Sequence, residues 1–286
     1  MFNVRLKRYL HTEQVHIFSK ALYSEGERVA KTKFDMTTGE IFPSNSNIFV
    51  NPFNGEFDYY YNMGDADENL RRSLRRTKNM IYDYAMSNDW SWFFTLTFNP
   101  EKVDSFDYTE TSRKLAKWLN NLRRTCPDLK YLVVPELHKS GRWHYHGIFA
   151  NCEKLKFIDS GHKDNKGRVI YNVGNYKLGF STATQIDDLQ ATCNYIIKYV
   201  SKELVSVTKG KHRYWASKNC DLPVIEEYYV GMSEKEILSC CSEERYVNKV
   251  CSEFCDVTYV SAPIYTTNTD FSKRYRHLLS YSVKYT

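Results

Sequence analysis

The pattern of hydrophobic and polar positions divides the central part of the chain into strands and helices. Apolar runs rich in β-branched and aromatic residues predict strands at residues 90–98, 131–137 and 143–150, and a further hairpin around residues 169–186. Apolar positions three or four residues apart predict helices at residues 65–87, 108–125 and 189–204. This order predicts an α+β domain, in which helices pack on an antiparallel sheet.

The pattern changes toward both ends of the chain. Short alternating segments among Gly and Asn turns predict a β-rich segment over residues 1–65. Residues 208–286 carry no pattern that predicts a structure, and we treat them as an appendage to the central residues 66–207. With 42% hydrophobic residues, the chain has enough apolar side chains to bury a core.

The predicted strand at residues 143–150 carries two histidines separated by one residue. His144 and His146 point to the same face, because side chains alternate along a strand, so both imidazoles can reach one ion. A three-residue hairpin loop with Gly141 in the left-handed position would pair Glu136 with His144. His138 lies on the same face and is the reserve candidate. A two-residue loop would instead place Glu136 on the wrong face.

The residues on this face favour a divalent cation. Two imidazoles and one carboxylate leave open positions for water and phosphate oxygens. The mixed nitrogen and oxygen donors suit Mn²⁺ or Mg²⁺ better than a closed structural zinc site, although catalytic zinc sites use similar ligands. The sequence has no HExxH motif, and residues 147–151 lack the glutamate that a cupin-like HxH motif requires. Unrelated strand histidines are the simpler alternative for a lone HxH pair.

The predicted helix at residues 189–204 carries two stripes. One is apolar and anchors the helix; it consists of Leu189, Cys193, Ile196, Val200 and Leu204. The other gathers two phenols and two ammonium groups, from Tyr195, Lys198, Tyr199 and Lys202. An amphipathic helix with its polar side in water would give the same pattern. The histidine pair about fifty residues earlier in the chain favours a chemical role for these side chains.

Three segments in order resemble the motifs of HUH endonucleases: FFTLTF at residues 93–98, HYH at residues 144–146 and YIIKYVSK at residues 195–202. The closest likeness is to rolling-circle replication initiators of single-stranded DNA phages and plasmids, and two tyrosines four residues apart resemble the phage-type subgroup. The likeness covers residues 66–218, including the segment RYWASK at residues 213–218. It departs from the family pattern at Tyr145, where a bulky apolar residue is usual. It implies a ferredoxin-like or RRM-like antiparallel sheet of about five strands.

The resemblance also implies a reaction. Such an enzyme nicks single-stranded origin DNA through Tyr195 or Tyr199, keeps the 5′ end on the phenol, and later reseals the strand. Lys198 and Lys202 would stabilise negative charge, because a phenol with a pKa near 10 is a weak nucleophile at neutral pH. No Walker A motif is present, so a separate helicase and the host polymerase are expected partners. A transposase with paired tyrosines and a non-catalytic nucleic-acid-binding module are the alternatives.

The charge of the chain agrees with a nucleic-acid partner. The formal net charge is +6, and aromatic residues make up 15% of the chain. Basic side chains form two clusters on predicted helices, which could also be solvated faces: Arg71, Arg72, Arg75, Arg76 and Lys78 in one, and Arg113, Lys114, Lys117, Arg123 and Arg124 in the other.

Neither a signal-peptide core nor a long apolar run appears, which predicts a cytoplasmic protein without a membrane partner. The eight cysteines are then expected to be free thiols. Cys240, Cys241, Cys251 and Cys255 could bind zinc, but paired CxxC knuckles are missing.

Overall fold

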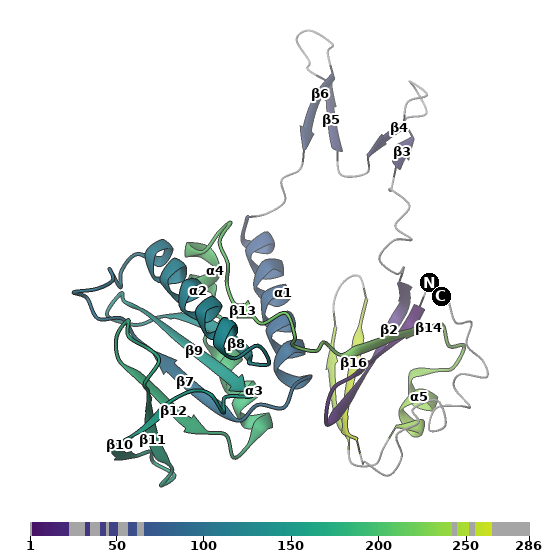
Figure 1. Cartoon of the computed structure of the whole chain (residues 1–286). Coiled ribbons are helices and arrows are strands. Elements are labelled where there is room, and N and C mark those ends of the chain that lie inside the picture. Colours follow the sequence, from purple (N-terminus) through teal and green to yellow (C-terminus); the bar gives the residue numbers. More distant parts are fainter. Residues whose placement is uncertain are drawn as a thin grey trace. The chain divides into compact units, whose positions relative to one another are not determined.

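The computed structural model describes residues 2–22, 32–34, 41–43, 46–50, 57–61, 66–241, 245–251 and 255–264 (Figure 1). The chain divides into two compact units. The larger unit is built from Arg8–Thr12 and Leu70–Val224, and the smaller unit from Met1–Lys7, Glu13–Asn69 and Ile225–Thr286. The two units are described separately below.

A seven-stranded sheet, counted over the described residues, forms the centre of the larger unit, in the order β10-β11-β12-β7-β9-β8-β13. Every neighbouring pair is antiparallel. The strands are β7 (Trp92–Leu96), β8 (Lys130–Leu137), β9 (Trp143–Ala150), β10 (Phe157–Lys163), β11 (Val169–Val173), β12 (Ser181–Gln185) and β13 (Trp215–Ala216). The α+β class is confirmed, whereas the expected number of about five strands is too small. The additional strands are β10, whose side chains are largely exposed and polar, and the two-residue β13, so neither shows an apolar alternation.

Helices cover both faces of this sheet. The helices are α1 (Ala66–Met86), α2 (Tyr108–Thr125), α3 (Leu189–Lys198) and α4 (Lys202–Val207). Helix α2 packs on the face of Tyr145 and Phe149, because the Tyr145 hydroxyl donates to Thr111 Oγ1 (3.1 Å) and the Trp118 ring lies 6.4 Å from Phe149. Helix α3 lies on the opposite face and contacts α1, where the Cys193 thiol donates to the carbonyl of Ala85 (3.2 Å). The predicted helices at residues 65–87 and 108–125 are confirmed.

The predicted single helix at residues 189–204 is wrong in one respect, because it is interrupted. Helix α3 ends at Lys198 with Tyr199 as its C-cap, and α4 begins after Ser201. The Ser201 side chain accepts a hydrogen bond from Leu204 N (3.1 Å), which is the typical N-cap contact of a new helix. The apolar stripe is still buried from Cys193 to Leu204. Lys202, the first residue of α4, no longer continues the stripe of Tyr195 and Lys198.

The smaller unit joins strands from the N-terminal and C-terminal parts of the chain in one sheet, in the order β14-β1-β2-β16-β15. Its strands are β1 (Phe2–Arg8), β2 (Thr12–Leu22), β14 (Val224–Tyr228), β15 (Tyr246–Val250) and β16 (Val257–Pro263), with α5 (Glu234–Cys240) beside them. Alternating residues Val4, Leu6, Val15 and Ile17 share a core with Tyr228 and Val260. The β-rich N-terminal segment and the appendage therefore meet in one fold. Two further hairpins pair β3 (Thr32–Phe34) with β4 (Ile41–Pro43), and β5 (Ser46–Val50) with β6 (Phe57–Tyr61).

The cysteines whose side chains are described are free, as predicted. Cys126, Cys152 and Cys193 are buried in the larger core, and Cys241 belongs to the core of the smaller unit. Cys251 is exposed. The Cys240 side chain lies outside the described part of the chain, so the four cysteines considered as a possible zinc site are not described as a whole.

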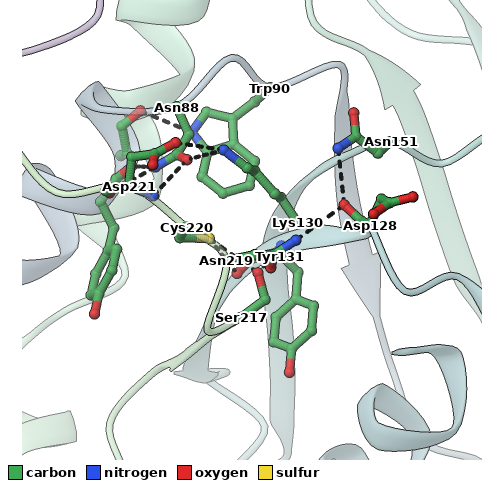
Figure 2. A network of polar contacts seen from close by, with 12 residues as sticks. Asn88, Trp90, Asp128, Lys130, Tyr131, Asn151, Ser217, Asn219, Cys220 and Asp221 are labelled. Carbon is green, nitrogen blue, oxygen red and sulfur yellow. Dashed lines mark hydrogen bonds and ion pairs between the residues drawn. The ribbon is translucent and has the colours of Figure 1, made fainter. Parts of the chain in front are cut away.

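A polar network fixes the segment after β13 to the start of β8 (Figure 2). The buried amide of Asn88 makes four hydrogen bonds: it donates to the carbonyls of Tyr84 (2.9 Å) and Asp221 (3.0 Å), and accepts from Lys130 Nζ and Asp221 N (both 2.9 Å). Lys130 Nζ also pairs with Asp221 Oδ2 at 2.6 Å. An asparagine side chain has no further hydrogen-bonding capacity, so Asn88 is fully used.

Replacing Asn88 with alanine is expected to lower the free energy of unfolding by about 2 kcal/mol, because it breaks four partly buried hydrogen bonds at once. Asp221→Asn is the matched control. It keeps both backbone bonds and loses only a charged pair whose carboxylate side chain is 68% exposed, so its effect should be below about 1 kcal/mol. Chemical denaturation of the two variants measures both changes. If Asn88→Ala and Asp221→Asn lowered the free energy of unfolding equally, Asn88 would not be the centre of this network.

Candidate active site on one face of the sheet

The hairpin of β8 and β9 has the predicted register. Glu136 pairs with His144, and the His138 N–H donates to the carbonyl of Arg142 (2.9 Å). Gly141 has a φ of +80°, a conformation that glycine adopts without strain. Thr95 of β7 is the partner of His146 on the other side of β9. Because directly opposed residues share a face, Glu136, His144, His146 and Thr95 lie on one side of the sheet, which we call the site face.

Glu136 and His146 form a direct contact on the site face. His146 Nε2 lies 2.7 Å from Glu136 Oε2, and in this hydrogen bond the ring nitrogen donates to the carboxylate. The bond lowers the pKa of Glu136 below its usual value, more than partial burial raises it. The carboxylate is therefore ionised at neutral pH and available as an oxygen ligand.

His144 and His138 form a second pair beside the first. Their rings stack with centroids 4.8 Å apart, and His138 Nδ1 lies 2.9 Å from Ser140 Oγ. Burial lowers the pKa of His144, and the charge of His138 adds a smaller decrease. The imidazole of His144 is therefore neutral near pH 7. The four side chains thus meet as two neighbouring pairs. Among the residues that the structure describes, no three or more His, Cys, Asp or Glu side chains are already arranged to hold a metal ion.

Thr95 is a site residue that the sequence analysis did not identify. Its Oγ1 lies 3.2 Å from His146 Nδ1, on the side of the ring opposite to the Glu136 contact. A hydroxyl can donate or accept, so Thr95 can support either neutral tautomer of His146. With Nδ1 as the donor to Thr95, Nε2 would present a lone pair, which is the form that a metal ligand needs. The signal was available in FFTLTF, where Thr95 interrupts an apolar strand.

The two tyrosines lie on the site face but contact different residues there: Tyr195 packs against Phe93, with ring centroids 5.6 Å apart, whereas Tyr199 contacts His146. The Tyr199 ring stacks on the His146 ring, with centroids 3.7 Å apart and an interplanar angle of 6°. Burial raises the pKa of Tyr199, and a hydrogen bond with Tyr195 and the negative charge of Glu136 add to this effect. Tyr195 packs edge-on against Tyr199 (5.2 Å) but remains 46% exposed. Tyr195 is therefore the more accessible of the two phenols.

The structure separates the two predicted lysines. Lys198 Nζ lies 5.6 Å from the centre of the Tyr195 ring, so it can place positive charge beside that phenol. Lys202 is exposed at the start of α4, beyond the break in the helix.

The two basic clusters lie on different sides of the larger unit. Helix α2, which carries Arg113, Lys114, Lys117, Arg123 and Arg124, covers the face opposite to the site face. Burial raises the pKa of Tyr131, and the positive charge of Arg123, a member of this cluster, opposes that rise. In the α1 cluster, Arg71, Arg72, Arg75 and Arg76 are exposed and Lys78 is half-buried. Since α1 contacts α3, the α1 cluster belongs to the layer that carries the tyrosines.

Over the described residues, the helices include none with the length and apolar character needed to span a membrane.

Comparison with known proteins relates the segment that carries the site to DNA replication. Neither the curated proteins nor the solved structures contain a match to this chain. Residues 91–204 match a family model described as replication-associated protein ORF2. The matched segment runs from the residue before β7 to the first turn of α4, and it contains both the histidine pair and the two tyrosines. The match supports a replication initiator.

Proposed function

We propose that this protein is a rolling-circle replication initiator that nicks and rejoins single-stranded DNA through a tyrosine. One observation carries the proposal: Tyr199 stacks on His146 at 3.7 Å, and His146 contacts Glu136 at 2.7 Å. A tyrosine ring and side chains of the kinds that can ligate a metal ion therefore meet on one sheet face, within the segment that matches the replication-associated family. This match favours an initiator over a transposase.

The residues of the site face fit a divalent cation. Glu136, His144 and His146 would hold it, with His138 as the reserve ligand, and His144 would turn from His138 toward Glu136, its partner in the register. An ionised carboxylate and neutral imidazoles are the forms that bind metal ions, and these donors suit Mn²⁺ or Mg²⁺. When bound, such an ion polarises a non-bridging phosphate oxygen and orients the phosphate.

The chain's own side chains would carry out the displacement. Tyr195 Oη attacks the scissile phosphorus and forms a new P–O bond, its proton leaves to solvent, and the bond to the 3′ oxygen breaks. The departing 3′ oxygen takes up a proton and becomes a hydroxyl, while the 5′ phosphate stays on the phenol. Lys198 places positive charge beside the attacking phenol. Attack by a 3′ hydroxyl on the phosphotyrosine reverses these steps and reseals the strand without ATP.

Tyr199 would act after Tyr195. Its raised pKa makes it the weaker nucleophile in the resting site, and its ring covers His146. One helical turn separates the two phenols, so each is within reach of the same phosphate at a different stage.

The partners follow from this chemistry. Single-stranded origin DNA would lie on the site face, and the α1 cluster would contact its phosphates. A separate helicase would open the duplex, and a host polymerase would extend the free 3′ hydroxyl in the cytoplasm.

The test is cleavage of an end-labelled library of single-stranded oligonucleotides with randomised sequence. We expect cleavage of a subset of sequences with Mn²⁺ and none after chelation with EDTA, because the phosphate is polarised only when the ion is bound. Binding of the library without cleavage, with Mn²⁺, Mg²⁺ and Zn²⁺ each supplied, would contradict the proposal and favour a non-catalytic binding module.

A further inference from the structure

An exposed phenylalanine, Phe180, lies on the site face directly before β12 begins. Phe180 is 62% exposed. Among the described residues, no aromatic ring stacks on it, and it is not part of the hydrophobic core. Isolated exposed apolar residues are common and need no explanation by themselves. Phe180 differs because its backbone is held by several hydrogen bonds and because it lies on the same face of the sheet as the proposed site residues.

The backbone of Phe180 is fixed by an extension of the β12–β7 ladder. Thr97 N donates to the Phe180 carbonyl (2.9 Å), Thr97 Oγ1 donates to the same oxygen (3.0 Å), and Asn99 N donates to the Leu178 carbonyl (2.9 Å). Between these bonds, Gly179 allows a close backbone approach, because a Cβ there would collide with the carbonyl oxygen of Thr97. The side chain of Phe180 is thus presented to solvent from a defined position.

The register places Phe180 in line with the proposed metal ligands. Phe180 and Thr97 each lie one residue beyond the Ser181–Leu96 pair, and Thr97 and His144 each lie one residue beyond the Leu96–Tyr145 pair. Side chains alternate along strands, so Phe180, Thr97 and His144 share the site face with Glu136. Phe180 is two strands from His144, which corresponds to about 10 Å between their backbones.

The surroundings of Phe180 suit a nucleic-acid strand. Lys102 Nζ donates to the carbonyl of Lys177, three residues before Phe180, and both lysines are exposed. An exposed aromatic ring on the same segment as exposed Lys177, to which exposed Lys102 is hydrogen-bonded, offers the combination that binds single strands, where bases stack on rings and phosphates contact ammonium groups.

We infer that Phe180 is a stacking platform for one nucleobase adjacent to the scissile phosphate. This inference rests on the proposed function. It also predicts the path of the bound strand, which would cross the sheet from the Glu136–His146 pair over Thr97 to Phe180. A stacked base would fix the register of the strand, so that one particular phosphate meets Tyr195.

The test measures binding without metal ions, so it does not depend on cleavage. Fluorescence anisotropy of a labelled oligo-dT strand of about 15 nucleotides should show that Phe180→Ala weakens affinity by roughly tenfold, since loss of one stacked base has an effect of this size. Phe180→Trp should bind at least as tightly as the wild type. Tyr246→Ala is the control, because Tyr246 is 71% exposed and lies in the smaller unit. Thermal unfolding should be unchanged in all three variants.

A second measurement localises the stack. A single abasic nucleotide is moved along a strand of mixed sequence chosen because the protein binds it in one register, and the affinity ratio of wild type to Phe180→Ala is measured for each position. One position should reduce the ratio to near unity, because the base that stacks on Phe180 is then missing. A ratio that is the same at every position, or a loss in Phe180→Ala no larger than in Tyr246→Ala, would overturn the inference. A wild type that binds and shows this pattern but never cleaves would overturn the proposed chemistry and leave the stacking role standing.

Discussion

Replacing His146 with alanine is expected to lower the rate of strand cleavage by at least about a hundredfold, while most binding of single-stranded DNA remains. His146 lies at the centre of the site: it contacts Glu136, Thr95 and the Tyr199 ring. Its loss would weaken the metal site, and polarisation of the phosphate contributes several kcal/mol to such reactions. Single-turnover cleavage and anisotropy measure the two effects separately.

The matched control for His146→Ala is His162→Ala, because His162 is an exposed histidine on β10 of the same sheet. Glu136→Gln and His138→Ala then identify the third ligand. Glu136→Gln keeps the size of the side chain but removes its charge, so cleavage should fall as in His146→Ala. Normal cleavage by Glu136→Gln together with loss in His138→Ala would show that the reserve ligand is the true one.

The second large effect is expected from the two tyrosines. Tyr195→Phe should lower the initial cleavage rate by about a hundredfold, because Tyr199 is half-buried, has a raised pKa and is less well placed for attack. Tyr199→Phe keeps the ring that stacks on His146, and its initial rate should stay within about tenfold of the wild type. The double substitution should leave no cleavage.

Tyr171→Phe is the control for a change of phenol on the same sheet, and we expect normal cleavage from it. A larger loss in Tyr199→Phe than in Tyr195→Phe would reverse the proposed order of the two nucleophiles. Unchanged cleavage by the Tyr195→Phe, Tyr199→Phe double variant would show that neither tyrosine is the nucleophile.

Local signals in the sequence predicted much of the site. Gly141 and the flanking apolar runs define the hairpin loop, and the loop defines the register that pairs Glu136 with His144. The spacing of apolar residues by three or four positions predicted which side of residues 189–204 is buried, including Cys193 and Ile196. These features depend on residues close together in the chain, which is why patterns reveal them.

Features that depend on distant contacts were not predictable in the same way. The break at Ser201 interrupts an apolar stripe that reads as continuous, since a serine is compatible with both a helix interior and an N-cap. The sheet that joins β1 and β2 to β14 and β16 requires pairing across more than half of the chain. The stacks of His138 on His144 and of Tyr199 on His146 are choices of side-chain rotamer, which a sequence pattern does not specify.

The most direct test of the proposed mechanism is the covalent product. The protein is incubated with Mn²⁺ and the randomised single-stranded library, denatured, digested with trypsin and analysed by mass spectrometry. We predict a nucleotide-bearing peptide whose modified residue is Tyr195, because nucleophilic displacement leaves the 5′ phosphate on the attacking phenol. Omission of the metal ion or the Tyr195→Phe, Tyr199→Phe double substitution should remove the adduct. Cleaved DNA with free 5′ phosphates and no protein adduct would contradict the tyrosine mechanism.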